Sequence, residues 1–217
     1  MSKAIVLFSG GQDSTTCLCQ AIEKYGKENI EAVSFDYGQR HKIELQCAKN
    51  ICQILDIKHK VYSLSIFEEL GNNSLIENID IVEEPGKLPN SFVPGRNLVF
   101  VTYAAIHAYQ RGANILITGM CQTDYSGYPD CRQETISALN TALELGMEYN
   151  ITILAPLMYL TKKQSVELIN ELGYLNILKY THTCYKGENP PCGKCPSCIL
   201  RAKGFAEAGI TDPLLNG

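Results

Sequence analysis

The sequence lacks the features that mark a membrane or secreted protein. No apolar run in its 217 residues approaches the length that spans a bilayer. A secretory signal is also missing, because the N-terminus leads directly into Ala4–Phe8, a short apolar run of strand length. We therefore expect a cytoplasmic protein without a membrane partner. The length suits one α/β domain with a small appendage.

An excess of basic residues is missing as well. The formal net charge is -4 at pH 7, whereas proteins that grip tRNA usually carry a basic face. This balance favours a small-molecule substrate and no direct contact with nucleic acid. Cysteine, in contrast, is abundant, with 10 residues. In a chain of this size without a signal, that number indicates reduced thiols and a metal site rather than a disulfide scaffold.

Two common nucleotide-binding motifs are absent, namely a Walker A loop and a Gly-x-Gly-x-x-Gly fingerprint. Instead, the segment Phe8–Thr16 reads Phe-Ser-Gly-Gly-Gln-Asp-Ser-Thr-Thr and is followed by a helical pattern. Backbone N–H groups at the two glycines, four hydroxyls and the positive end of the helix dipole converge there. We interpret this turn as a cradle for a phosphate chain. The alternative is an ordinary strand-to-helix turn.

Strand and helix patterns alternate along the rest of the chain. Further strands are predicted at Ile30–Tyr37, Lys60–Leu64, Asn114–Gly119 and Ile151–Leu154, with helical patterns between most of them. Such repetition indicates parallel strands joined by right-handed crossovers, with ligands at the carboxyl ends of the strands. We therefore predict an α/β fold with a Rossmann-like five-stranded parallel sheet and helices on both faces.

Two polar segments are expected near that edge of the sheet. The second predicted strand runs into Tyr37, Arg40 and His41, and Arg40 either reaches ATP phosphates or is a solvated charge. The segment 65–96 is acidic and rich in proline and glycine. A connection of this length is typical of a lid, a binding loop or disorder.

A long apolar helix is predicted after this connection. A Pro-Gly turn places Arg96 and Asn97 at the start of the helix, where an anion is favoured. The helix Leu98–Tyr109 is almost wholly apolar, so we expect it to be buried. His107 within it is expected to be a satisfied core residue rather than a ligand.

The segment Gly119–Arg132 gathers two acidic residues, two tyrosines and an arginine around glycine and proline. Carboxylates are natural acceptors for the N–H donors of a guanine-like base, and tyrosine rings can stack on its face. The alternative is a polar surface loop. The candidate substrate-binding residues are Arg96, Asn97, Asp124, Tyr128, Asp130 and Arg132.

A lysine is predicted at an unusual helix position. Thr161 and Gln164 have the spacing of a capping box, which places Lys162 in the first helical turn. The helix dipole disfavours a cation there, and a bound phosphate would reverse that effect. We interpret Lys162 as a phosphate ligand; otherwise it is an exposed side chain.

A cysteine cluster lies near the C-terminus. Cys184, Cys192, Cys195 and Cys198 form a set of four thiols with two Cys-x-x-Cys steps that share Cys195. Four thiolates complete a tetrahedral zinc site without leaving a position for water, so we predict one structural zinc ion per chain. A redox Cys-x-x-Cys pair and an iron–sulfur cluster remain alternatives.

Together, these motifs resemble those of a known enzyme family. Ser9–Ser14 resembles the PP-loop of the ATP pyrophosphatases. With Tyr37–His41, Phe92–Asn97, Thr123–Arg132 and Cys184–Cys198, the chain resembles the 7-cyano-7-deazaguanine synthases, from Ile5 to about Arg201.

The resemblance implies an ATP-dependent C–N ligase that converts 7-carboxy-7-deazaguanine and ammonia to 7-cyano-7-deazaguanine. Lys162 and Arg96 would neutralise phosphate charge, and Asp13 would be the acidic partner of Mg²⁺. Residues 1–179 would form the ATP-binding domain, and 180–217 a zinc-binding segment. The implied ATP-binding residues are Phe8, Ser9, Gly10, Gly11, Gln12, Asp13, Ser14, Thr15, Thr16, Cys17, Leu18, Tyr37 and Arg40.

Partners and competing functions follow from the same resemblance. No segment has the size of an added glutaminase domain, so ammonia is either free or delivered by a partner. Such enzymes are commonly homodimers. One alternative function is a PP-loop tRNA thiolation enzyme that uses Cys121 or Cys131 as a persulfide carrier. The other is a non-catalytic nucleotide-binding zinc module.

Overall fold

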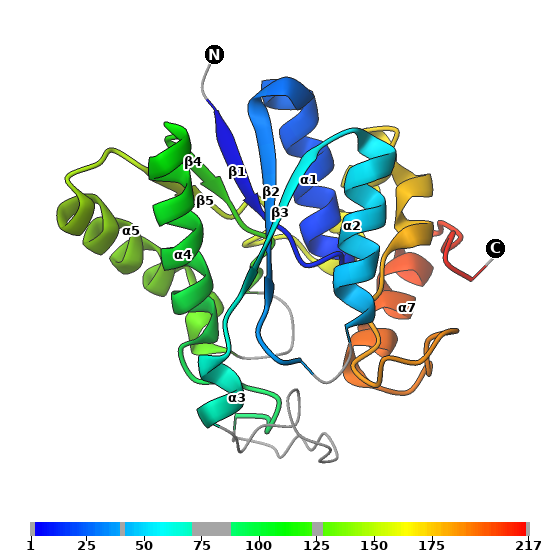
Figure 1. Cartoon of the computed structure of the whole chain (residues 1–217). Coiled ribbons are helices and arrows are strands. Elements are labelled where there is room, and N and C mark those ends of the chain that lie inside the picture. Colours follow the sequence, from blue (N-terminus) through cyan, green and yellow to red (C-terminus); the bar gives the residue numbers. More distant parts are fainter. Residues whose placement is uncertain (1–2, 40–41, 71–87, 123–127, 216–217) are drawn as a thin grey trace.

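A parallel sheet of five strands organises the protein, as the alternating sequence pattern predicted. The computed structural model describes residues 3–39, 42–70, 88–122 and 128–215 (Figure 1). The strand order is β3-β2-β1-β4-β5, and every neighbouring pair is parallel. The strands are β1 (Ala4–Leu7), β2 (Ile30–Asp36), β3 (Lys58–Ser63), β4 (Ile115–Ile117) and β5 (Thr152–Leu154).

Helices cover both faces of the sheet (Figure 1). One face packs against α1 (Gln12–Tyr25), α2 (Ile43–Leu55), α6 (Lys162–Glu171) and α7 (Pro196–Ala208). The other face packs against α3 (Ile66–Leu70), α4 (Arg96–Arg111) and α5 (Gln133–Met147). Three short 3₁₀ helices, Lys27–Asn29, Pro129–Cys131 and Leu175–Tyr180, complete the described elements.

The central strand is apolar on both sides because both faces of the sheet are covered. Ala4 and Val6 of β1 belong to the core under α1 and α2, whereas Ile5 between them belongs to the core under α4. All three side chains are buried. A near-continuous apolar run is the usual sequence of a parallel strand that is buried on both faces.

The expectation that the apolar helix Leu98–Tyr109 is buried holds for only one side of the helix. In α4, Tyr103, Ile106 and Tyr109 are 45%, 43% and 54% exposed. The reason is that α4 lies on the outside of the sheet, so one stripe of the helix, including Val101 and Ala105, meets the core.

His107 is the core residue that the sequence predicted. It is buried, its Nδ1 lies 2.8 Å from the Tyr62 hydroxyl, and its Nε2 lies 3.1 Å from Glu31 Oε1. The segment 65–96, expected to be a lid, a binding loop or disorder, is described only in part. It begins with α3, and its residues 71–87 lie outside the described part of the chain.

The C-terminal tail is held by a buried ion pair. The Arg201 guanidinium in α7 donates from Nε and Nη2 to the two carboxylate oxygens of Asp212, at 2.7 and 2.8 Å. It also donates to the Thr181 hydroxyl and the Leu178 carbonyl. These bonds connect the end of the chain to the turn before the cysteine cluster.

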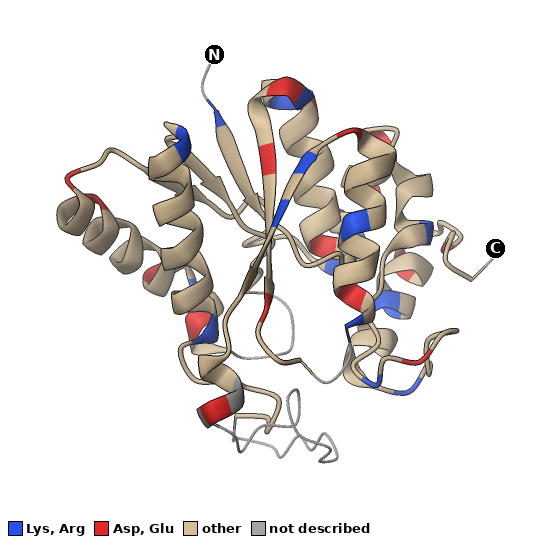
Figure 2. Ribbon diagram, in the orientation of Figure 1, with Lys and Arg blue, Asp and Glu red and all other residues tan. Residues whose placement is uncertain are grey.

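Charged residues of both signs occur along the described elements. Figure 2 shows acidic and basic residues interspersed along the described helices and strands. In the same part of the chain, no helix is both long and apolar enough to cross a bilayer.

Candidate active site

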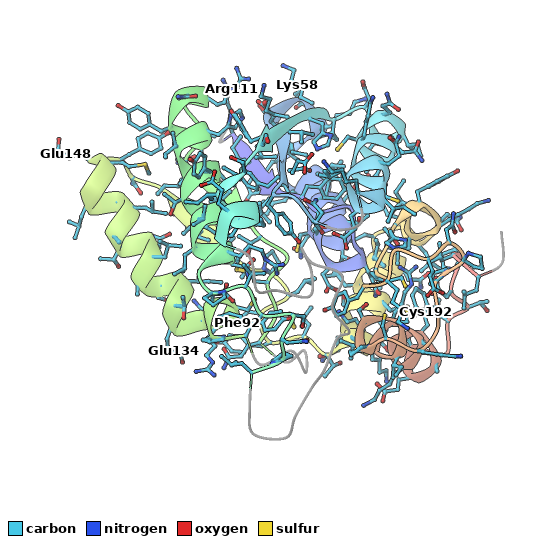
Figure 3. All side chains as sticks on the ribbon, turned by 60° about the horizontal axis from the view of Figure 1, so that its bottom comes forward. Lys58, Phe92, Arg111, Glu134, Glu148 and Cys192 are labelled. Atoms are coloured by element: carbon cyan, nitrogen blue, oxygen red, sulfur yellow. The ribbon has the colours of Figure 1, made fainter. Side chains whose placement is uncertain are left out.

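A cavity of about 400 Å³ opens at the carboxyl edge of the sheet. Phe8 follows β1, Tyr37 follows β2 and Gly119 follows β4, and all three line it. This is the edge at which parallel α/β sheets bind ligands. Figure 3 turns this edge toward the viewer, with Phe92 on the α4 side and Cys192 on the α7 side. Lys58 and Arg111 mark the opposite edge.

One wall of the cavity is formed by the turn between β1 and α1 and by a lysine from α6. We call these residues the loop cluster (Ser9, Gly11, Asp13, Ser14 and Lys162). The N–H group of Gly11 donates to Ser9 Oγ at 3.2 Å, and Ser9 Oγ lies 3.0 Å from Ser14 Oγ. These bonds fix the turn at the N-terminus of α1, where unpaired N–H groups and the helix dipole favour an anion.

Gly10 in this turn is required by packing. Its φ is +86°, and a Cβ atom there would lie 2.4 Å from the Glu44 carbonyl oxygen in α2. The Gly10 carbonyl accepts a hydrogen bond from the His182 N–H group at 3.1 Å. The turn is therefore clamped between α2 and the segment that precedes the cysteine cluster.

Two of the four hydroxyls that we expected in the phosphate cradle point elsewhere. The Thr15 hydroxyl donates to the Gly11 carbonyl at 2.8 Å, and the Thr16 hydroxyl donates to the Gln12 carbonyl at 3.1 Å. Both side chains are fully buried, as are Cys17 and Leu18. None of these four residues lines the cavity, because they belong to the inner face of α1.

Lys162 is not the exposed side chain of the alternative interpretation. Thr161 and Gln164 form the predicted capping box at the start of α6. The Lys162 side chain is 9% exposed, and its Nζ lies 2.9 and 2.7 Å from the two carboxylate oxygens of Asp13. The Asp13 carboxylate therefore offsets the unfavourable placement of a cation in a first helical turn.

The second wall is aromatic and contains one guanidinium group; we call it the aromatic cluster (Tyr37, Arg96, Phe100, Tyr128 and Tyr185). The Arg96 guanidinium carbon lies 5.4 Å from the centre of the Tyr37 ring, and Nη1 donates to the Tyr37 hydroxyl at 3.3 Å. The Tyr37 and Phe100 rings are 5.3 Å apart. Burial raises the pKa values of Tyr37 and Tyr185, so both rings stay neutral near pH 7.

Several predicted substrate-binding residues are placed elsewhere. Asp130 is 6% exposed and does not line the cavity, and its Oδ2 accepts a hydrogen bond from the Asn97 N–H group in the first turn of α4. Arg132 is exposed before α5. Asn97 and Tyr128 do line the cavity. Asp124, Arg40 and His41 lie outside the described residues.

Three buried polar atoms around the cavity lack a hydrogen-bond partner in the described part of the protein. They are Gln12 Nε2, Arg96 Nε and Thr183 Oγ1, and each belongs to a residue that lines the cavity. A buried donor without a partner costs about 1–3 kcal/mol. All three atoms lie around one cavity, where a polar ligand would complete their bonding.

The sequence interpretation missed Glu44. It lies in the first turn of α2 and lines the cavity. Burial raises the pKa of its carboxyl group to about 7, although the nearby Arg96 charge lowers it. Its position was the available signal, because α2 starts at the carboxyl edge, just after the segment that contains Tyr37.

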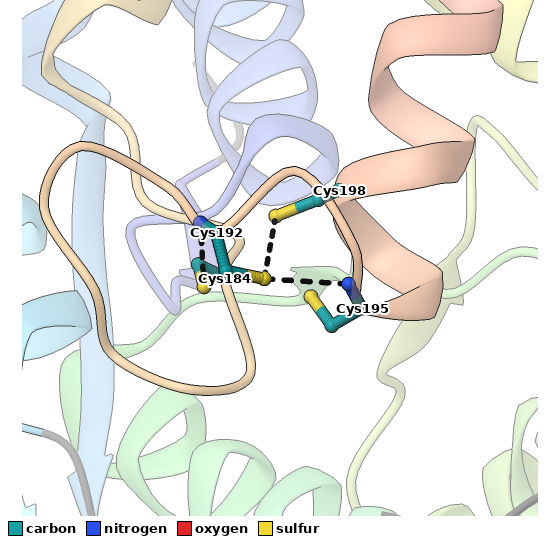
Figure 4. Close-up of side chains that lie close together, drawn as sticks. All are labelled: Cys184, Cys192, Cys195 and Cys198. Atoms are coloured by element: carbon teal, nitrogen blue, oxygen red, sulfur yellow. Dashed lines mark hydrogen bonds between the residues drawn. The ribbon is translucent and has the colours of Figure 1, made fainter.

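The four C-terminal cysteines converge as predicted (Figure 4). Their Sγ atoms all lie within 4.8 Å of one another. Tetrahedral zinc with bonds of about 2.3 Å holds its sulfurs roughly 3.8 Å apart, so the set fits zinc after small side-chain shifts. The N–H groups of Lys194 and Cys195 donate to Cys192 Sγ at 3.4 and 3.3 Å. These bonds lower the pKa of the Cys192 thiol to about 7.

The cysteine segment is also part of the cavity wall. Thr183, Cys184, Tyr185 and Ser197 line it. Of the other cysteines, Cys17, Cys19 and Cys52 are buried in the core, whereas Cys47, Cys121 and Cys131 are half-buried.

A family model supplies the identification. The model described as "Queuosine biosynthesis protein QueC" matches residues 3–209. The chain belongs to the QueC family. A 7-cyano-7-deazaguanine synthase of Chromobacterium violaceum is 54% identical, over 98% of this chain and 93% of the relative. A second 7-cyano-7-deazaguanine synthase, of Laribacter hongkongensis, is 50% identical, over 98% of this chain and 94% of the relative.

A solved structure shares the fold of this QueC-family chain. It is a 4-thiouridine synthetase in complex with RNA and with bound ATP, and it matches with a TM-score of 0.55 at 19% identity. The match covers 94% of this chain but 53% of that chain. The likeness is one of fold.

Proposed function

We infer that this protein converts 7-carboxy-7-deazaguanine and ammonia to 7-cyano-7-deazaguanine with ATP. The observation that carries the inference is a single cavity that joins the loop cluster to the aromatic cluster. The first cluster suits a triphosphate, and the second suits a flat base that carries a carboxylate. The near-full-length similarity to two synthases supports the same reaction.

The first half of the reaction makes an amide. A substrate carboxylate oxygen attacks the α-phosphorus of ATP, the bond to the β-phosphate breaks, and pyrophosphate leaves. Ammonia then attacks the acyl carbon of the adenylate, loses a proton and displaces AMP. A carboxylate is a poor electrophile, so adenylation supplies the leaving group.

The second half makes the nitrile from the amide. The amide oxygen attacks the α-phosphorus of a second ATP, pyrophosphate leaves, and one N–H proton is lost. Cleavage of the C–O bond with loss of the second N–H proton forms the nitrile and releases AMP. Both halves use the same adenylation step and need no covalent nucleophile from the protein.

The chain's own residues would act through charge and position. Lys162 neutralises charge on the departing pyrophosphate, and the N–H groups at the start of α1 hold the phosphates. Arg96 holds the substrate carboxylate by paired hydrogen bonds. Asp13 fits Mg²⁺, because its carboxylate oxygens keep free lone pairs beside Lys162 and because Mg²⁺ usually binds one or two carboxylates plus phosphate oxygens and water.

We propose a structural zinc ion for the segment 180–217 and ATP binding for residues 1–179. Four thiolates would close the zinc coordination, so a zinc ion held there would supply rigidity to the cavity wall. We also propose that ammonia enters free or from a partner. We also propose that the protein forms a homodimer. Light scattering tests the dimer.

The tRNA thiolation alternative is less well supported. A persulfide carrier needs an accessible thiol with a low pKa, but burial raises the pKa of Cys131 to about 12. Cys121 Sγ donates to the Leu160 carbonyl at 3.4 Å. Activity that survives a Cys121→Ser, Cys131→Ser double substitution would dispose of this alternative.

Mass spectrometry of the products tests the proposed function. The protein is incubated with 7-carboxy-7-deazaguanine, Mg-ATP and ¹⁵N-labelled ammonium. We expect a nitrile that carries one ¹⁵N atom, with AMP and pyrophosphate formed in step. Unconverted 7-carboxy-7-deazaguanine would contradict the proposal. Nucleotide binding without pyrophosphate release would also contradict it and would favour the non-catalytic module.

A further inference from the structure

An acidic side chain lines the cavity beside the aromatic cluster. Glu44 is half-buried in the first turn of α2. Its carboxylate forms no hydrogen bond or ion pair with the residues that the structure describes. A carboxylate that is partly removed from water and left unpaired is costly. Such a group is retained where a ligand supplies the missing donors.

The groups that face Glu44 come from several elements. Arg96 approaches from α4, Tyr37 from the turn after β2, and Tyr185 from the cysteine segment, while Cys47 lies on α2 itself. Of these four, Arg96 is the charged one near pH 7. Arg96 and Glu44 do not form an ion pair in the structure, so each remains available to a ligand.

This combination matches the two ends of a 7-carboxy-7-deazaguanine. The carboxylate on its five-membered ring needs a cation. The six-membered ring presents two adjacent donors, the N1–H and the 2-amino group, which need a carboxylate. The flat ring system needs apolar faces, and Tyr37, Phe100 and Tyr185 line the cavity between them.

We propose that Glu44 recognises the donor edge of the deazaguanine, accepting hydrogen bonds from N1–H and the 2-amino group. The proposal rests on the function inferred above and names the specificity residue of that site. Asp130 is less suited, because its carboxylate already accepts the Asn97 N–H group and does not line the cavity.

A pH dependence follows from the same contact. With its pKa near 7 in the free protein, Glu44 is largely ionised at pH 8 and largely protonated at pH 6. The two donors of the base favour the ionised form, so its pKa falls on binding. Affinity for the base is therefore full above pH 7 and declines as the pH falls below 7.

The test compares Glu44→Gln with the wild-type protein and with Glu134→Gln, an exposed carboxylate in the first turn of α5 (Figure 3). Glutamine keeps the size of the side chain but turns one acceptor into a donor. We expect the KM for the acid substrate to rise about 10- to 100-fold in Glu44→Gln, with the KM for ATP within about 2-fold. Glu134→Gln should match the wild type.

A second measurement uses an analogue that lacks the 2-amino group. Calorimetry should show that the wild-type protein at pH 8 binds this analogue about 10-fold more weakly than the acid substrate. The preference should shrink at pH 6 and in Glu44→Gln. This wild-type measurement decides the question even if the variant does not fold.

Three outcomes would overturn the proposal. They are equal rises in KM for ATP and for the acid in Glu44→Gln, an undiminished preference for the 2-amino group in that variant, and a preference that does not change between pH 8 and pH 6. A wild-type protein that neither binds nor converts the acid would instead overturn the proposed function, and the two failures are therefore distinct.

Discussion

The loop cluster and the aromatic cluster face the same cavity but are assembled in different ways. In the loop cluster, Ser9, Gly11, Asp13 and Ser14 are close neighbours in sequence, and Lys162 alone comes from elsewhere. The aromatic cluster takes one or two residues from each of four segments that are far apart along the chain. Local geometry therefore builds the proposed phosphate site, whereas packing of the whole fold builds the proposed base site.

This difference has energetic consequences. A turn at a helix N-terminus binds phosphate through backbone groups that most substitutions leave in place. The base site depends on side chains whose positions depend on α2, α4 and the cysteine segment. We expect substitutions in the loop cluster to slow the reaction of ATP. We expect changes in packing to weaken the binding of the base first.

The largest effect should come from Lys162→Ala. Loss of the ammonium group leaves pyrophosphate charge uncompensated and leaves Asp13 without its ion pair, so kcat should fall about 10²- to 10³-fold. Pyrophosphate release measures it. Lys163→Ala is the matched control, because Lys163 is 46% exposed and pairs with Glu167 in the same helix. Similar losses in both variants would contradict the assigned role of Lys162.

Metal removal should have the next largest effect. A chelator would remove the proposed zinc ion, and Cys195→Ser would remove one of its four ligands. Structural zinc sites supply about 10–16 kcal/mol of folding free energy in small domains. Here we expect a lower Tm and weaker binding of the acid substrate, because Tyr185 and Thr183 line the cavity. Elemental analysis and calorimetry measure these effects. Cys47→Ser, at a half-buried cysteine outside the cluster, should keep one zinc per chain. A Cys195→Ser protein with full zinc and unchanged binding would refute the assignment.

Gly204→Ala should lower kcat by a smaller factor, because Gly204 in α7 contacts Lys162 of the loop cluster. A Cβ atom at Gly204 would lie 2.5 Å from Lys162 Cγ, so either the lysine side chain or α7 must shift, and the contact with Asp13 is disturbed. We expect about a 10-fold loss of kcat, of the order that misplaced catalytic groups cause. Gly146→Ala in α5 is the control, because a Cβ atom there meets nothing within 4 Å. It should keep activity and gain about 0.5–1 kcal/mol of stability. Full activity in Gly204→Ala would show that α7 does not position Lys162.

The smallest effect should come from Asp130→Ala. The structure gives Asp130 a capping role at α4, so the variant should lose about 1 kcal/mol of unfolding free energy. Urea denaturation measures the loss. The sequence predicted a role in base recognition instead. A KM for the acid that rises far more than the KM for ATP would restore that earlier prediction.

The sequence predicted most of the fold because the pattern was local. Each strand of the sheet was predicted, and boundaries differed by up to two residues, as at β3, which starts at Lys58 rather than Lys60. The PP-loop, the capping box at Thr161 and the cysteine cluster were all read from short spacings. Each of these features is fixed by residues within 15 consecutive positions.

The errors at α4 and Glu44 arose where distant packing decides, and the error at Thr15 and Thr16 arose within one helix. Tyr103 and Ile106 lie on the exposed side of α4, where no described residue covers them. The composition of the helix alone does not reveal which of its sides is exposed. Thr15 and Thr16 were assigned to the cradle because they follow the glycines, but the helix geometry turns both hydroxyls back to carbonyls. Glu44 was missed because its neighbours come from other elements.

The ion pair between Arg201 and Asp212 limits how the chain can be shortened. The family match ends at residue 209, yet Asp212 beyond it satisfies a buried guanidinium that also bonds to the turn before Cys184. A chain trimmed to the family boundary would leave this cation buried without its counter-ion, which is strongly unfavourable. Fusion partners should therefore be joined beyond Asp212 and the turn that follows it.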